Sequence, residues 1–362
     1  MAFYVTLVVL IAVVFGLKFW TVNEYALTPG DATPVAPLVS IHGLSVDTHH
    51  DKIMLTDVYL QTLNRWQWIV LHFRSHVEFV PANELVDPGV PTDELSAQGF
   101  LEMYGSKQDA EVAAFRSLGW KVPSTQTGAI VNAVVAPSPA RRAHLHVADE
   151  IVSVDAKVVG NSCDLIGDVR SLAPGTLVHL GVKRANISAK GVITWRAPTT
   201  INVTTAAIPK SASAAIVGCP GVTGSARSWL GLIPQDGFDY RLPAKVNIDT
   251  SNIGGPSAGL AMTLTLIDQL TKGSLTGHHV VAATGTIDVY GDVGDVGGVA
   301  EKTAAAQSAG AQYFIVPQVE VATAQANASP GLRIIGVTTL AQALNDLRAI
   351  GGAPPVPLTT PH

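Results

Sequence analysis

Ser257 and Lys302 are the two residues of this sequence whose surroundings suggest acyl-transfer chemistry. Ser257 follows Gly-Gly-Pro and precedes an apolar run over residues 260–267 with helical spacing. Pro256 fits the first position of that helix, with Gly255 as its N-cap. We therefore predict that Ser257 lies in the first helical turn, where backbone N–H groups lack intrahelical partners.

The loop before this helix is a candidate oxyanion site. An alkoxide or tetrahedral oxyanion formed at Ser257 would be stabilised by the free N–H groups and by the positive end of the helix dipole. Glycines beside the serine leave room for a substrate backbone to approach. The residues assigned to this oxyanion and substrate loop are Gly254, Gly255, Pro256 and Ala258.

Lys302 is a candidate for the base that such a serine needs. It lies in an alanine-rich helical stretch, residues 299–308, which is followed by Gly310. Lys302 shares its helix face with small apolar residues, whereas Glu301 points elsewhere. Burial disfavours the ammonium, so a pKa lowered from about 10.4 towards neutrality would leave free amine to take the serine proton. Taken alone, the lysine equally fits a side chain whose stem covers its own helix.

Several short motifs connect these two residues. Gly-Pro-Ser-Ala-Gly around Ser257, Ala-Thr-Gly-Thr-Ile at residues 283–287 and Gly-Gly-Val-Ala-Glu-Lys ending at Lys302 occur in this order. Together they resemble the proteolytic domain of Lon proteases, over roughly residues 208–350. The resemblance implies a Ser-Lys dyad with Ser257 as nucleophile and Lys302 as general base, and it implies that Thr284 contacts the lysine.

The sequence departs from the family pattern at two positions near the dyad. Thr286 stands where the family usually has an acidic residue, and Asn252 stands where related membrane-anchored members often have Asp. A different motif, the G-x-S-x-G elbow of α/β-hydrolases, also fits around Ser257. That fold needs an acid and then a histidine later in the chain, and no long α/β pattern separates an acid from the histidines that follow, so we reject it.

Composition sets the general frame. At 362 residues, 47% of them hydrophobic and 14% charged, the chain has room for two or three domains with buried cores. The net charge of −5 and the lack of a basic run argue against a nucleic-acid partner. Cys163 and Cys219 cannot make a disulfide framework; they are two free thiols or one bridge. The predicted fold class is α/β (α+β) and multidomain.

Residues 1–17 form an unbroken run of apolar and small neutral residues, followed by Lys18, Phe19 and Trp20. The run reaches the lower limit of a bilayer span, and the aromatic residues suit an interface. No signal-peptidase-like site follows closely, so we predict an uncleaved, single-pass transmembrane anchor. Its orientation is not specified, because no lysine or arginine precedes the run.

Residues 18–121 are predicted to form a juxtamembrane region of strands and helices. It contains a Pro/Gly-rich extended connector at residues 28–39, a strand at 53–60 and a long helix at 93–118. A helix is predicted at residues 63–76, where Trp66, Ile69, Val70 and Phe73 recur at helical spacing. The histidine pairs of this region lack a metal-site pattern, and we predict no metal.

Residues 122–205 resemble a PDZ domain, through a strand at 129–135, the motif Ala-Asp-Glu-Ile-Val-Ser-Val-Asp-Ala from Ala148, a helix at 162–172 and Pro-Gly-Thr-Leu-Val-His-Leu from Pro174. A PDZ domain binds peptide by adding a strand at a sheet edge. By position, the carboxylate-facing loop and the first residues of the groove are Thr127, Gly128, Ala129 and Ile130, with helix 163–169 opposite. A PDZ fold used only as a spacer is the alternative.

No phosphate-binding loop of the form G-x-x-x-x-G-K-[ST] occurs in the sequence, so we expect neither ATP nor another cofactor. We predict a Lon-type proteolytic domain at residues 206–350 and a disordered tail at 351–362. The resemblance implies a membrane-anchored, ATP-independent serine endopeptidase that forms a homo-oligomeric ring outside the cytoplasmic membrane of a bacterium. Its substrates would be unfolded or extended proteins and peptides. The alternatives are a non-catalytic PDZ scaffold and a Ser-Lys amidase or esterase.

Overall fold

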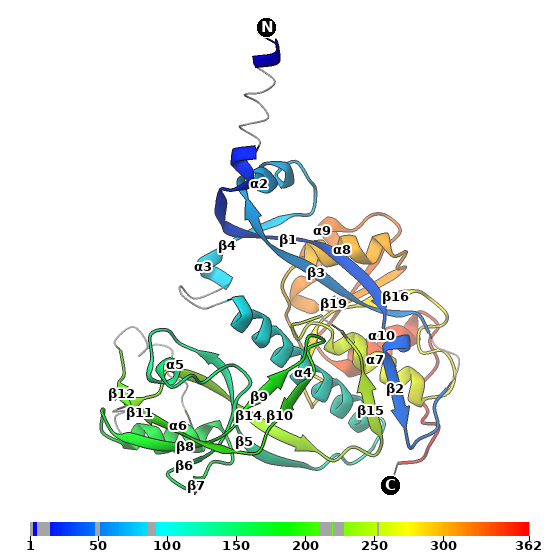
Figure 1. Cartoon of the computed structure of the whole chain (residues 1–362). Helices are drawn as coiled ribbons and strands as arrows, with labels where there is room; N and C mark the ends of the chain where they lie inside the picture. The colour runs from blue at the N-terminus through cyan, green and yellow to red at the C-terminus, as the bar shows by residue number, and fades with distance from the viewer. Residues whose placement is uncertain are drawn as a thin grey trace.

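The computed structural model describes residues 3–5, 15–47, 51–85, 92–209, 219, 228–251 and 253–361. Two main sheets lie on either side of the long helix α4 (Thr92–Ser117), as Figure 1 shows. In spatial order, the first sheet contains β20 (Arg333–Val337), β19 (Tyr313–Pro317), β16 (Val281–Ala283), β3 (Ile53–Asn64), β1 (Thr21–Pro34) and β4 (Glu78–Pro81). Its strands from β20 to β3 are parallel, whereas β1 and β4 are added in antiparallel orientation.

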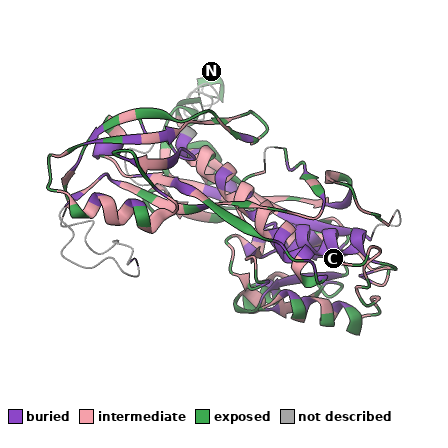
Figure 2. Cartoon of the chain, turned by 90° about the horizontal axis from the view of Figure 1, so that it is seen from below, coloured by how far each residue is buried: buried purple, intermediate pink, exposed green. Residues whose placement is uncertain are grey.

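Helices cover both faces of the first sheet because its strands are apolar on both faces. Leu55 and Ile315 point into one core, which they share with α4, α7 (Gly259–Leu270) and α10 (Leu340–Ala349). Met54 and Phe314, one position away, point into the opposite core with α8 (Val299–Ser308) and α9 (Val321–Asn327). Every residue of α7 is buried, and Figure 2 shows buried residues concentrated where helices and sheet meet.

The strand β1 was not predicted. Of the stretch assigned to an extended surface connector, residues 28–39, the part up to Pro34 belongs to β1 and pairs with β3, with an irregular register between Pro29 and Ala32. Its partner on the other side, β4, pairs only with residues 24–27. The prolines therefore lie where β1 has no second neighbour, and a missing N–H costs no ladder bond there.

The second sheet contains, in order, β11 (Thr199–Thr204), β8 (Leu177–Lys183), β6 (Glu150–Val154), β5 (Ser124–Val134) and β14 (Leu232–Tyr240), with β7 (Lys157–Val158) paired to β6. Helix α6 (Ser162–Ser171) packs on this sheet, and α5 (Pro139–Arg142) follows β5. The last strand in the order, β14, comes from beyond residue 205. The two sheets thus cross the predicted boundaries, since the first takes strands from 18–121 and from 206–350.

Short elements complete the fold. Four two-stranded pairs are β2 (Val39–His42) with β15 (Lys245–Ile248), β9 (Ala185–Ile187) with β10 (Ile193–Trp195), β12 (Ala206–Ala207) with β13 (Ser228–Trp229), and β17 (Thr286–Ile287) with β18 (Val293–Gly294). The remaining helical turns are η1 (Ala36–Leu38), α2 (Arg65–Leu71), α3 (Ala82–Leu85) and η3 (Gln318–Glu320).

The C-terminal stretch differs from its predicted disorder. Among its described residues, 351–361, Lys272 N–H donates to the carbonyl of Val356, and Leu358 N–H donates to the carbonyl of Leu270. These bonds attach the stretch to the end of α7. A proline-rich composition favours an extended chain, and an extended chain can still pair with an exposed backbone.

The predicted membrane anchor lies largely outside the described residues, since 1–2 and 6–14 are not among them. Within the described part of the chain, no helix combines the length and the apolar character that a membrane crossing requires.

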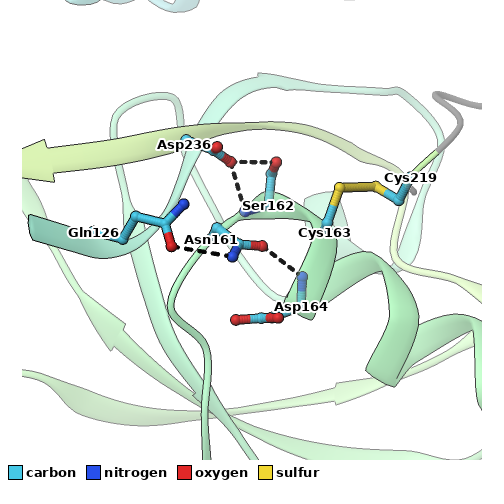
Figure 3. The surroundings of a disulfide bond; sticks show 7 residues. All are labelled: Gln126, Asn161, Ser162, Cys163, Asp164, Cys219 and Asp236. Atoms are coloured by element: carbon cyan, nitrogen blue, oxygen red, sulfur yellow. Dashed lines mark hydrogen bonds between the residues drawn. A yellow bond between two sulfur atoms is a disulfide. The ribbon is translucent and has the colours of Figure 1, made fainter. Parts of the chain in front are cut away.

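Cys163 and Cys219 form a disulfide, with a Cα–Cα distance of 5.5 Å. Figure 3 shows the bond at the N-terminal end of α6, beside the hydrogen bonds that Ser162 donates to Asp236 of β14. The bridge attaches residue 219 to the helix of the second sheet.

Candidate active site

The loop that carries Ser257 turns sharply before α7. Gly255 adopts φ +87°, and its N–H donates to the carbonyl oxygen of Gly99 at 2.8 Å. The helix begins at Gly259, later than predicted, with Ala258 as its N-cap. The reason is that the Ser257 carbonyl accepts hydrogen bonds from Gly285 N–H (2.9 Å) and Thr284 Oγ1 (3.2 Å), which direct it away from a helical ladder.

The N–H groups of Ser257 and Ala258 lie just before the N-terminus of α7. Within the described part of the chain, neither donates a hydrogen bond to a protein group. Both are therefore free to donate to an oxyanion, in the positive field of the helix terminus. Of the predicted loop, Gly254, Gly255 and Pro256 adjoin the serine, while Asn252 lies outside the described residues.

Helix α4 holds this loop in place. Ser106 Oγ, buried on α4, donates to the carbonyl oxygen of Pro256 at 2.9 Å, and Gly99 on the same helix accepts from Gly255. A side chain at Gly254 would meet the backbone of Gly99 at 3.1 Å. The backbone before Ser257 is hydrogen-bonded to α4, and the Ser257 carbonyl is hydrogen-bonded to residues 284–285. These contacts on both sides set the orientation of Ser257.

Lys302 lies on α8 with 3% of its surface exposed. Burial lowers its pKa to about 8, because the ammonium loses solvation, although the charges of Asp57, Glu320 and Glu301 act in the opposite direction. Its Nζ makes neither a hydrogen bond nor an ion pair with any residue that the structure describes. Glu301 faces another part of the molecule, near His76 and Glu78, and burial raises its pKa.

Among the acidic groups, Asp57 on β3 has the largest effect on the pKa of Lys302, which it raises. Burial raises the pKa of its carboxyl group, while the N–H of Asp31 donates to its Oδ1 at 2.6 Å. The Asp31 carboxylate in turn accepts from the hydroxyl of Tyr59 at 2.6 Å. Only glycine fits at Gly30, because a Cβ there would stand 1.9 Å from Asp57 Oδ1.

One cavity of about 440 Å³ brings these groups together. Ser257 and Lys302 both line it, although they belong to elements far apart in the sequence. Thr56 also lines the cavity, and its buried hydroxyl has no hydrogen-bond partner in the described structure. The remaining wall includes Asp31, Asp57, Tyr59, Met103, Asp249, Ser251, Ile253, Gly254 and Ala258.

Thr284 is fully buried at the end of β16. The resemblance implies contact with Lys302, whereas the hydrogen bond found joins its hydroxyl to the Ser257 carbonyl. Thr284 therefore acts on the backbone of the nucleophile loop.

The predicted peptide groove of the second sheet is wrong. Gly128, Ala129 and Ile130 lie on β5, which pairs with β14 along one edge and with β6 along the other. Ala129 and Ile130 have a paired strand on both sides, so a peptide strand cannot be added beside these two residues.

A cavity of about 150 Å³ lies instead between α6 and the end strand β14. Leu165, Ile166 and Val169 of α6 form one wall, and Trp229 to Pro234 form the other. Gly231 adopts φ +80°, and its carbonyl accepts from Val135 N–H at 2.9 Å, which ties this turn to β5. The apolar-Gly-apolar sequence Leu-Gly-Leu at residues 230–232 was the signal that sequence reasoning passed over.

Two family models match parts of the chain. Residues 249–347 match the model of the Lon protease (S16) C-terminal proteolytic domain, and residues 116–190 match that of the PDZ domain. The chain thus contains a Lon-type proteolytic domain and a PDZ domain. The matched regions exclude five strands of the two sheets: β1, β3, β4, β11 and β14.

Individual relatives are similar over short regions only. Lon protease of Rickettsia conorii is 35% identical over 103 residues, covering 28% of this chain and 13% of that protein. Lon protease 2 of Bacillus subtilis is 33% identical over 120 residues, covering 33% and 20%. The chain thus spans a fifth or less of the length of these relatives. The PDZ domain of an SdrC-like protein from Listeria monocytogenes is 18% identical with a TM-score of 0.21, covering 30% of this chain and 87% of that one.

Several residues that shape the site escaped sequence reasoning. Ser106 and Gly99 belong to a helix that showed only polar character, and Asp57 and Asp31 belong to strands assigned to another region. One signal was present: Asp57 is a lone carboxylate inside the apolar strand pattern Ile-Met-Leu-Thr-Asp-Val-Tyr-Leu. A charge in such a strand is uncommon without a partner.

Proposed function

We propose that this protein is a serine endopeptidase that works without ATP, with Ser257 as nucleophile and Lys302 as general base. The observation that carries the proposal is the shared cavity, which is lined both by a buried lysine without a partner in the described structure and by a serine at a helix N-terminus. A lysine amine with a pKa of about 8 is a competent base near neutral pH.

The proposed reaction begins when the Lys302 amine takes the proton of Ser257 Oγ and Oγ forms a bond to the substrate carbonyl carbon. The oxyanion so formed accepts hydrogen bonds from the N–H groups of Ser257 and Ala258. As the carbon–nitrogen bond breaks, the Lys302 ammonium returns its proton to the leaving amine. Water then attacks the acyl ester; Lys302 accepts the water proton and delivers it to Ser257 Oγ.

The carboxylate of Asp57 has a defined part in this scheme. Its charge favours the ammonium form of Lys302, and so offsets part of the cost of burying that charge after proton transfer. Asp57 thus acts through Lys302 as a positioning and electrostatic residue.

The test is hydrolysis of an unfolded protein by the full chain, with and without ATP. We expect cleavage that does not depend on ATP and that Ser257→Ala and Lys302→Ala both abolish. Ser308→Ala and Lys245→Ala are matched controls at exposed positions and should cleave like the parent. Equal cleavage by all variants would refute the dyad, and hydrolysis of esters but not of peptides would indicate an esterase.

We also propose that the PDZ domain selects substrates through the cavity between α6 and β14. The apolar lining suits a hydrophobic side chain of a peptide, and β14 has no further strand beyond it in the described part of the sheet. Ile166→Lys should weaken binding of a peptide with a hydrophobic C-terminal residue, measured by fluorescence anisotropy. The control is Val158→Lys, which changes an exposed residue of the same sheet. Ile130→Lys is unsuitable as a control because Ile130 is buried.

Location and assembly belong to the same proposal. The apolar run at residues 1–17 supports a single-pass anchor in the cytoplasmic membrane. The disulfide between Cys163 and Cys219 favours an oxidising compartment, so we place the two domains outside the cytoplasm. Assembly into a homo-oligomeric ring is proposed from the resemblance alone, and sedimentation of the detergent-solubilised chain would test it.

A further inference from the structure

Helix α2 and the turn that follows it present four apolar side chains that are partly or largely exposed. Trp66, Ile69 and Val70 lie on α2 and are 37%, 37% and 36% exposed, and Phe73, two residues beyond the end of α2, is 87% exposed. We call these four residues the α2 apolar face. Such a stripe normally packs into a core. Here the core contact is made by the other side of the helix, where Leu71 is buried.

The helix is held rigidly in this orientation. Asn64 and Gln67 form a capping box at its N-terminus. On the inner side, Trp68 Nε1 donates to Glu24 of β1 at 2.6 Å, and the Trp68 ring contacts His72. These contacts attach the opposite side of α2 to the sheet and leave the α2 apolar face on the outer side.

The α2 apolar face continues into the residues that follow the N-terminal apolar run. Arg65 N–H donates to the Trp20 carbonyl at 2.8 Å, and the Arg65 guanidinium lies 4.7 Å from the centre of the Trp20 ring. Phe19 and Trp20 are themselves exposed, by 74% and 62%. Figure 1 shows α2 beside the base of the N-terminal segment, at the end of the molecule far from the second sheet.

The charges around this surface are mainly positive. Lys18, Arg65 and Arg74 lie in the segments around it, against Glu24, which keeps its charge while it accepts from Trp68, and Glu78 at the start of β4, so the balance is +1. Aromatic side chains bordered by basic residues suit the interface of a bilayer with anionic headgroups. A second copy of the chain fits less well, because four partly exposed side chains offer on the order of a few hundred Å², below the ~800 Å² per partner of a standard interface.

We propose that the α2 apolar face inserts into the headgroup region of an anionic lipid bilayer and so holds the body of the protein against the membrane surface. This contact is separate from the N-terminal run, because it fixes the tilt of the folded part rather than the attachment of the chain. Its existence does not depend on peptidase activity.

The experiment uses the full chain, whose two cysteines are paired with each other, so an introduced cysteine is the single free thiol. Phe73→Cys is labelled with an environment-sensitive fluorophore and mixed with vesicles of phosphatidylcholine and phosphatidylglycerol. Leu177→Cys, exposed on β8 in the second sheet, is the matched control. We expect a blue shift at position 73, with quenching by lipids spin-labelled near the headgroup, and neither effect at position 177.

The chain could co-float with the vesicles through its N-terminal run alone. If a water-soluble quencher then reaches the labels at positions 73 and 177 equally, the proposal is overturned. Failure of the chain to co-float would overturn it as well. Protection of position 73 without vesicles, increasing with protein concentration, would assign the face to a second copy instead. In the labelled Phe73→Cys chain, Trp66→Ser with Ile69→Ser should abolish the blue shift while cleavage of a soluble substrate is unchanged.

Discussion

Replacing Lys302 with methionine should stabilise the protein at neutral pH while abolishing activity. The ammonium at this position is 3% exposed, and its burial lowers the pKa from 10.5 to about 8. At ~1.4 kcal/mol per pKa unit, holding the proton in the folded state costs on the order of 3 kcal/mol. Methionine retains the apolar stem without the charge, so this cost disappears.

The effect has a defined pH window. Below about pH 8 the lysine is protonated in both the folded and the unfolded state, and the full cost is present. Between about pH 8 and 10.5 unfolding takes up a proton, so the free energy of unfolding of the parent rises with pH. Above 10.5 both states hold the neutral amine, and the difference from Lys302→Met no longer changes.

The assay is urea unfolding of parent and Lys302→Met at pH 7 and pH 10, both in a Ser257→Ala background to prevent self-cleavage. At pH 7 the free energy of unfolding of the variant should exceed that of the parent by up to ~3 kcal/mol, and this difference should be smaller at pH 10. The other titrating groups are common to both proteins and cancel in the difference. Lys245→Met, at an exposed position, should show no such pattern. A variant less stable than the parent at pH 7, or a gap independent of pH, would refute the buried-ammonium reasoning.

Three further outcomes are expected. Peptidase activity should rise about tenfold from pH 7 to pH 9 as the Lys302 amine, with its pKa of about 8, loses its proton, and Lys302→Arg should be inactive at both pH values because guanidinium stays charged. Asp57→Asn should move the midpoint of that pH–rate profile downwards, since its carboxylate raises the pKa of Lys302; an upward move would contradict the assignment. Ser106→Ala should lower kcat by roughly tenfold with KM unchanged, because it frees the Pro256 carbonyl and misplaces Ser257, whereas Ser117→Ala on the same helix should behave like the parent in single-turnover assays.

Local patterns in the sequence were sufficient for elements whose cause is local. The predicted helix 299–308 coincides with α8, since apolar spacing and the glycine at residue 310 act over a few residues. The helix predicted at 93–118 is α4 to within a residue at each end. For the same reason, the types and order of the residues around Ser257 and Lys302 indicate acyl transfer without any knowledge of their tertiary contacts.

Only the tertiary structure decided what depends on partners distant in the sequence. Strand pairing is such a case: β1 joins a sheet with β3 and β16, and β14 closes the edge where a peptide was expected to bind, because backbone groups pair with any strand that the fold brings alongside. The start of α7 is another, since residues 284–285 take the Ser257 carbonyl. The sequence by itself determined which side chains could do the chemistry. Packing between segments that no local pattern links places these side chains in one cavity and buries Lys302, which lowers its pKa. The same packing brings α4 to the serine loop, where Ser106 donates to the Pro256 carbonyl.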